Sequence, residues 1–161
     1  IFVEGADDFD RLPIFCENSG FAELKKDFYL LGGCADFSVF KELCEHFGIE
    51  PYFIFDLDVI STNNSFTRNF PAQVWEDIQQ LNKKTKKKDP SNLLDENLNE
   101  EERALKYQII NKLTEHKIFV FPHGAIEQYL NENGDVIGEN DDEKETNSGG
   151  LKRIFSGIQE S

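Results

Sequence analysis

The sequence predicts an α/β fold with a central, mostly parallel sheet of about four strands that is flanked by helices and carries a helical insertion. Two features of its first half support this prediction: short apolar runs alternate with amphipathic stretches, and the apolar runs are nearly continuous. Alternation of strands and helices is typical of parallel strands joined by right-handed crossovers. Strands without a polar face fit a sheet that is covered on both sides.

The first half of the chain contains three predicted strands and two predicted helices. The helices place apolar residues three or four positions apart, which is the spacing of one helical face. Gly20 and Gly48 close the two helices, and glycine is common directly after a helix C-terminus. In chain order the predicted elements are a strand over 1–3, a helix over 8–19, a strand over 27–33, a helix over 36–48 and a strand over 51–58.

The second half changes character at Pro71. Two helical stretches joined by a polar connection predict a helical insertion, after which a strand over 117–124 and the start of a helix at Ala125 follow. Residues 132–150 are acidic, glycine-rich and poor in apolar residues, which predicts a flexible segment. We therefore expect one domain over 1–161, with a core in 1–60 and 117–131, an insertion over 71–116, a flexible acidic segment over 132–150 and a C-terminal element over 151–161.

Composition and charge exclude several classes of protein. The formal net charge of −14 argues against a generic polyanion binder, so a nucleic-acid ligand would require bound metal or a neighbouring basic domain. Cys16, Cys34 and Cys44 show no CxxC spacing, which predicts buried thiols in a reducing, cytoplasmic compartment and neither a disulfide framework nor a zinc site. No apolar run approaches the roughly 18 residues of a membrane span. Since the chain enters a strand directly at Ile1, we expect it to be a fragment of a longer protein.

Acidic side chains follow two of the predicted strands. Glu4 leaves the first strand, and Asp56 and Asp58 leave the third. In an open parallel sheet, ligands bind outside the carboxyl ends of the strands, where these acids are expected to meet. A solvated turn or a helix cap is the ordinary alternative for each acid alone, and Asp7 in particular is expected to be a helix N-cap. Their joint placement favours a site for Mg²⁺ or Mn²⁺, since hard oxygen ligands suit these ions.

Three short motifs carry a resemblance to a known family: "IFVEGADD", "LGG" and "IFDLD". Together they resemble the Toprim domain, the metal-dependent catalytic fold of type IA and II topoisomerases, primases and several nucleases, with a Glu after the first strand and DxD after the third. Within that superfamily the chain is most similar to the C-terminal Toprim of OLD-family (overcoming lysogenization defect) ATP-dependent nucleases. This closer match rests on Asp8, on the two glycines and on the late motif "VFPHGAIEQYL", and it covers roughly residues 1–60 and 117–131.

The resemblance implies a Toprim-like, Rossmannoid fold and a catalytic site. The ligands of two Mg²⁺ or Mn²⁺ ions would be Glu4, Asp8, Asp56, Asp58 and Glu127. OLD-type sites also use a lysine near the scissile phosphate, for which Lys152 is the candidate, in competition with Lys144 and Arg153. The implied activity is that of a DNA endonuclease, in which metal-activated water hydrolyses the phosphodiester bond.

The resemblance also implies partners. They are DNA, an ABC-type ATPase domain in cis or in trans and further copies of the full-length chain, in an anti-phage defence protein. The sequence departs from the family pattern in two ways, because it contains no Walker A motif and its helical insertion is longer than a minimal Toprim needs.

The only basic run in this acidic chain lies in the insertion. It is "KKTKKK", with Lys83, Lys84, Lys86, Lys87 and Lys88. A solvated helix end is its ordinary interpretation, and a contact with the DNA backbone is the functional one.

Two other functions remain open. The stretch "FIFDLDVIS" also resembles the nucleophile motif of HAD-type phosphatases, in which Asp56 would be phosphorylated and Asp58 would act as acid and base. That motif belongs on the first strand of its family, whereas two strand–helix units precede it here. The other alternative is a catalytically inactive Toprim that serves only for docking.

Overall fold

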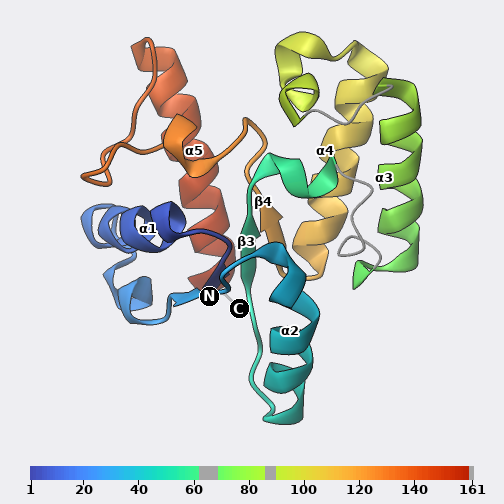
Figure 1. Cartoon of the computed structure of the whole chain (residues 1–161). Coiled ribbons are helices and arrows are strands. Elements are labelled where there is room, and N and C mark those ends of the chain that lie inside the picture. Colours follow the sequence, from blue (N-terminus) through green and yellow to red (C-terminus); the bar gives the residue numbers. More distant parts are fainter. Residues whose placement is uncertain (62–68, 86–89, 160–161) are drawn as a thin grey trace. The chain divides into compact units, whose positions relative to one another are not determined.

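The structure is a computed structural model that describes residues 1–61, 69–85 and 90–159 (Figure 1). It is an α/β fold in which four parallel strands form the central sheet and helices flank it, which confirms the predicted fold class. The sheet order is β2-β1-β3-β4, with β1 at Phe2–Val3, β2 at Tyr29–Leu30, β3 at Phe53–Phe55 and β4 at Ile118–Val120. The chain divides into two compact units: the first unit is Ile1–Gly32 with Ile126–Ser161, and the second unit is Gly33–Ala125.

The first unit combines β1 and β2 with α1 (Ala6–Asn18) and α5 (Asp141–Gln159). The two strands pair in parallel with Phe2 opposite Tyr29. Helix α1 buries Leu12, Phe15 and Cys16 on one face, as the apolar spacing predicts. It begins at Ala6, two residues before the predicted start, because the carboxylate of Asp8 accepts a hydrogen bond from the Gly5 N–H and closes the first turn.

The C-terminal part of the first unit corrects two predictions. Residues 141–150, expected to be flexible, form the first half of α5, and 151–159 continue the same helix. The first half has few apolar residues, which is why its composition predicts a flexible segment. Only Asn147 is buried there, whereas Leu151 and Phe155 are buried in the second half. The acidic residues at the N-terminus of α5 also suit the positive end of the helix dipole. The helix expected from Ala125 is only the short 3₁₀ helix η7 (Ile126–Gln128).

The second unit is built around β3 and β4. These strands pair in parallel, with Phe53 opposite Ile118, and every residue in both strands is buried. Helix α2 (Phe37–His46) packs against β3 through Phe37, whose ring centroid lies 4.6 Å from that of Phe53. β3 and β4 are therefore fully enclosed, as the sequence predicts, whereas both residues of the edge strand β2 are exposed.

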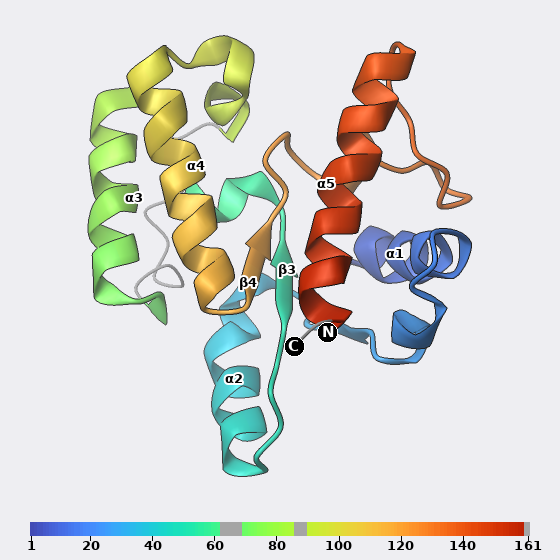
Figure 2. The same cartoon turned by 180° about the vertical axis from the view of Figure 1, so that it is seen from behind.

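The described part of the stretch between β3 and β4 contains two α-helices. They are α3 (Ala72–Thr85) and α4 (Glu100–Glu115), and they lie side by side in both views of the molecule (Figure 1, Figure 2). The segment between them contains the 3₁₀ helices η5 (Pro90–Leu93) and η6 (Asp95–Asn97). Both predicted helices are confirmed, and each buries an apolar stripe. The stripe includes Ile78 on α3 and Ile109 on α4.

A capping box begins α4. The side chain of Asn99 accepts a hydrogen bond from the Glu102 N–H at 2.9 Å, and the Glu102 carboxylate accepts one from the Asn99 N–H at 3.0 Å. We expect Asn99→Ala to lower the free energy of unfolding by about 1 kcal/mol, because one donor at the helix start loses its acceptor. Urea unfolding of the variant and the wild type measures the difference. An unchanged unfolding midpoint would contradict the capping role.

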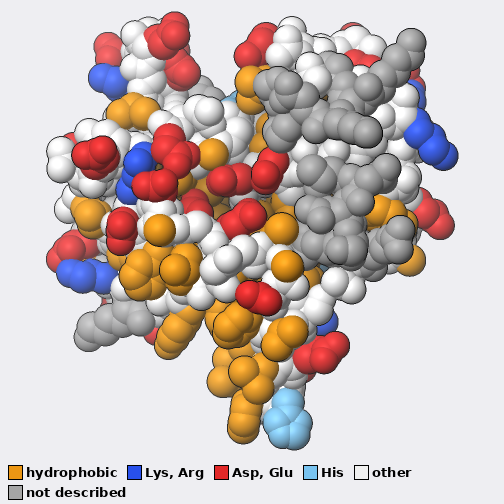
Figure 3. Space-filling model, viewed as in Figure 1, with side chains coloured by type: hydrophobic (Ala, Val, Ile, Leu, Met, Phe, Trp, Pro, Cys, Tyr) orange, Lys and Arg blue, Asp and Glu red, His pale blue; other side chains and the backbone are white. Residues whose placement is uncertain are grey.

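One face of α2 leaves hydrophobic side chains in solvent. Val39, Leu43 and Phe47 are spaced four residues apart, and their exposed fractions are 64%, 49% and 67%. Figure 3 shows hydrophobic side chains gathered over this helix. These side chains add little to the buried core, so truncating one of them serves as a control for core substitutions.

The structure also bears on the cysteines and on membrane spans. All three cysteines are free, and Cys16 and Cys44 are buried as predicted. The prediction of a buried thiol is wrong for Cys34, which is partly exposed because it begins the short turn η2 (Cys34–Asp36) directly after two glycines. No helix in the described part of the chain is long and apolar enough to cross a membrane.

Candidate functional site

The first unit holds three of the predicted site residues. Glu4 directly follows β1 and is partly buried, while Asp8 lies in the first turn of α1 and exposes only 3% of its surface. One carboxylate oxygen of Asp8, Oδ2, accepts the Gly5 N–H at 2.9 Å. Its other oxygen, Oδ1, is buried and has no hydrogen-bond partner among the described residues. Asp8 therefore has one oxygen that supports the helix and one that can accept a ligand.

Asp8, and not Asp7, accepts the hydrogen bond at the start of α1. Asp7 is exposed and forms an ion pair with Arg11 at 3.3 Å, one turn later on α1. The hydrogen bond that closes the helix start belongs to Asp8, because α1 begins at Ala6 and Asp8 then occupies its third position. The prediction of Asp7 as the N-cap is wrong, and Gly5 occupies that position.

The negative charge of Glu127 acts on the carboxylate of Asp8. Burial raises the pKa of Asp8 to about 6, and the negative charges of Glu127 and Asp7 act in the same direction, against the Gly5 hydrogen bond and the charge of Arg11. Glu127 is exposed on η7. The first unit therefore brings these two predicted ligands close enough for their charges to interact. A cation beside them would compensate this repulsion, so the donor set of hard oxygens fits Mg²⁺ or Mn²⁺.

Two polar side chains support the segment that carries Glu127. Arg11 on α1 donates from Nη1 to the Leu130 carbonyl at 2.9 Å. Asn147 on α5 is buried, and its Nδ2 donates to the carbonyls of Gln128 at 3.1 Å and Ile137 at 2.8 Å. The sequence prediction missed both residues. Arg11 lies at ordinary helical spacing, and Asn147 lies in a stretch whose composition indicated no helix.

The second unit holds the DxD pair at the end of β3. Asp56 is partly buried and precedes the 3₁₀ helix η3 (Leu57–Ile60), which contains Asp58. Between them Leu57 is buried, and its N–H donates to the Gly124 carbonyl at 3.0 Å. The buried Leu57 and this hydrogen bond fix the backbone between the two carboxylates. Asp58 is exposed, yet the protein atoms around its carboxylate remove part of its water and raise its pKa.

The predicted ligands are divided between the units. Glu4, Asp8 and Glu127 belong to the first unit, and Asp56 and Asp58 belong to the second. Over residues 1–61, 69–85 and 90–159, no group of three or more His, Cys, Asp or Glu side chains could hold a metal ion.

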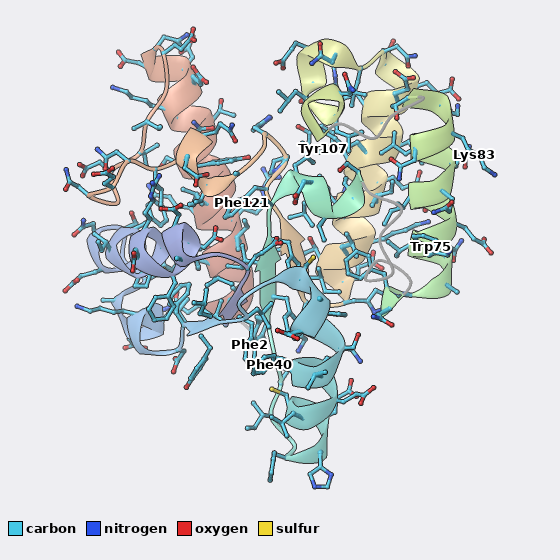
Figure 4. All side chains as sticks on the ribbon, viewed as in Figure 1. Phe2, Phe40, Trp75, Lys83, Tyr107 and Phe121 are labelled. Atoms are coloured by element: carbon cyan, nitrogen blue, oxygen red, sulfur yellow. The ribbon has the colours of Figure 1, made fainter. Side chains whose placement is uncertain are left out.

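The described basic candidates lie on α3 and α5. Lys152 is exposed on α5, as are Lys144 and Arg153. Lys83 is exposed on α3 and projects outward from it in Figure 4, and Lys84 forms an ion pair with Glu101. The other three members of the basic run, Lys86, Lys87 and Lys88, lie outside the described residues.

The buried carboxylate of Asp8 predicts a pH-dependent stability. Its pKa is raised from 3.8 to about 6 in the folded chain, so between these values the unfolded chain has lost a proton that the folded chain still binds. The unfolding free energy therefore falls as pH rises through this range. Relative to Asp8→Asn, we expect the wild type to lose about 2–3 kcal/mol between about pH 4 and pH 7.5.

Urea unfolding without divalent metal, at both pH values, measures this difference. The control is Asp10→Asn on the same helix, an exposed position at which the variant should follow the wild type. An Asp8→Asn variant whose difference from the wild type does not change with pH would contradict the effect of burial.

Comparison with known proteins provides no relative. No protein-family model, no curated protein and no solved structure matches the chain.

Proposed function

We propose that the chain is a divalent-metal-dependent DNA endonuclease of the Toprim type, most similar to the nuclease part of OLD-family proteins. The observation that carries the proposal is the position of acidic residues directly after parallel strands, with Glu4 after β1 and Asp56 after β3. The buried Oδ1 of Asp8 supports it, since a buried carboxylate oxygen without a donor is suited to a cation.

The proposal assigns roles to the chain's residues. Glu4, Asp8, Asp56, Asp58 and Glu127 would hold two Mg²⁺ or Mn²⁺ ions. Such ions supply Lewis-acid activation of the attacking water and stabilise the leaving oxygen. The Gly5 hydrogen bond orients the Asp8 carboxylate, and the Leu57–Gly124 hydrogen bond fixes the backbone between the DxD carboxylates. Lys152 would contact the phosphate next to the scissile bond.

The context follows from the same resemblance. The partners would be DNA, an ABC-type ATPase domain in cis or in trans and further copies of the full-length chain, in a cytoplasmic anti-phage defence protein. The basic run at the end of α3 would contact the DNA backbone, which an acidic chain needs at some point of its surface.

A HAD-type phosphatase is the second candidate. The raised pKa of Asp58 favours it, because the second aspartate of that motif must carry a proton to act as an acid. The order of elements argues against it, since the DxD follows the third strand in the chain and a glutamate follows the first.

Two assays distinguish the candidates. The endonuclease should nick supercoiled plasmid DNA in Mn²⁺, and EDTA should abolish the nicking. The phosphatase should hydrolyse p-nitrophenyl phosphate and lose this activity in Asp56→Asn. Phosphatase activity without nicking would replace the proposal with the second candidate, and the absence of both activities would leave a docking module.

A further inference from the structure

Lys106 on α4 is a fully buried lysine with an exposed fraction of 0%. Lysine is almost never fully buried unless it is paired. Its Nζ donates to the carbonyls of Leu93 at 3.1 Å and Pro122 at 3.0 Å, and it forms an ion pair with Asp95. An ammonium group has three donors, and these three acceptors use all of them. This side chain therefore connects α4 with η5, with η6 and with the residues that follow β4.

Asp95 is the acidic partner of this lysine. Burial lowers the pKa of Lys106, but the hydrogen bond and the negative charge of Asp95 oppose that effect. The second oxygen of Asp95 accepts the Tyr107 O–H at 2.8 Å, and Tyr107 extends from α4 toward the segment that contains η6 (Figure 4). Partial burial acts to raise the pKa of Asp95, and the hydrogen bonds from Lys106 and Tyr107 outweigh it and lower that pKa.

Pro122 links this lysine to the DxD pair. It lies in the segment 121–124, which directly follows β4 and makes two backbone hydrogen bonds around Asp56. The Phe121 N–H donates to the Phe55 carbonyl at 3.0 Å, and the Gly124 carbonyl accepts the Leu57 N–H at 3.0 Å. Asp56 is thus held between two hydrogen bonds to a segment that Lys106 binds at its second residue. Pro122 has no N–H, so its carbonyl is the only backbone hydrogen-bonding group through which this residue can be held.

We propose that Lys106 is a positioning residue for Asp56 and Asp58: from α4 it holds the Pro122 carbonyl and thereby fixes the segment 121–124 to which the DxD backbone is hydrogen-bonded. Helix α4 is then a structural support of the DxD backbone. The role of the two aspartates as ligands rests on the proposed function, whereas the chain of hydrogen bonds from Lys106 to Leu57 does not.

Amide hydrogen exchange at Leu57 tests the proposal directly. Lys106→Met keeps an unbranched apolar side chain and removes all three donors. We expect the Leu57 N–H to exchange about tenfold faster in this variant, because its acceptor segment is no longer fixed. The Leu31 N–H, which donates to Val3 in the first unit, should keep its wild-type rate. A matched control is Tyr107→Phe, which removes a hydrogen bond to Asp95 and leaves Lys106 and Pro122 in place.

Mn²⁺ affinity provides a second measurement. Residues that support metal ligands typically contribute about tenfold or more to affinity, so Lys106→Met should weaken Mn²⁺ binding by at least about tenfold and Tyr107→Phe much less. Should Lys106→Met fail to fold, Asp95→Asn replaces it, with a smaller change expected in the same direction.

Unchanged exchange at Leu57 in a folded Lys106→Met or Asp95→Asn variant would overturn the proposal, as would equal acceleration at Leu57 and Leu31. A wild type that neither binds Mn²⁺ nor nicks DNA would overturn the proposed function, and the exchange rates would still decide whether Lys106 fixes the DxD backbone.

Discussion

Asp56→Ala is expected to abolish Mn²⁺-dependent nicking while leaving the fold intact. Asp56 is partly buried at the end of β3. Under the proposed function, its loss would remove a metal ligand and a charge that holds the ion. A ligand contributes more than a residue that merely supports one, so the rate should fall by at least about a hundredfold. The fold should survive because the Leu57–Gly124 and Phe121–Phe55 backbone hydrogen bonds on either side do not use this side chain.

Nicking rates and urea unfolding of purified variants measure both parts of this prediction. Glu4→Ala should cause a loss of the same order, because the proposal places its carboxylate on the same ions. Glu115→Ala, an exposed carboxylate at the end of α4, is the matched control and should nick at the wild-type rate. Nicking that survives both Asp56→Ala and Glu4→Ala would end the nuclease assignment.

Phe155→Ala is expected to have the largest effect on stability. This side chain of α5 is fully buried, and its ring lies 5.9 Å from those of Phe15 and Phe21 and 6.1 Å from that of Phe28, measured between centroids. Removing it leaves a cavity in the core of the first unit, which should lower the free energy of unfolding by about 3–5 kcal/mol. The same urea unfolding experiment measures this loss.

The control for this prediction is Phe47→Ala. Phe47 exposes 67% of its surface, so its removal creates no cavity and should change the unfolding free energy by less than about 0.5 kcal/mol. Equal effects of the two substitutions would show that α5 is not anchored in the core through Phe155.

Local patterns in the sequence predict much of this fold. The apolar run that contains Phe53 and Phe55 identifies β3, and the two aspartates directly after it are visible without any structure. The helical spacing of apolar residues likewise identifies α1 and α2 to within two residues at each end, with 8–19 predicted and Ala6–Asn18 observed for α1. The two helices are set by burial on one face, which sequence periodicity records, and β3 by burial along its whole length.

Contacts between distant parts of the chain are not visible in this way. Asn147 and Lys106 are polar residues, of types that are mostly exposed, yet both are buried on the apolar faces of their helices. Asn147 donates to the Gln128 carbonyl, 19 residues away, and Lys106 donates to the Pro122 carbonyl, 16 residues away. Every residue has a backbone carbonyl, so the sequence does not indicate which one will accept such a hydrogen bond. The first half of α5 escaped prediction for the same reason. Tertiary hydrogen bonds and helix capping stabilise it where apolar residues are few.

The proposed function requires Glu4 and Asp56 to bind the same divalent ions. A double-mutant cycle on Mn²⁺ affinity tests it most directly, with isothermal titration of the wild type, Glu4→Ala, Asp56→Ala and the double variant. If the two carboxylates share ions, each substitution alone should remove most of the binding and the second should add little, so that the effects are strongly non-additive. Independent, additive losses of affinity, or a wild type that binds no Mn²⁺, would contradict the claim.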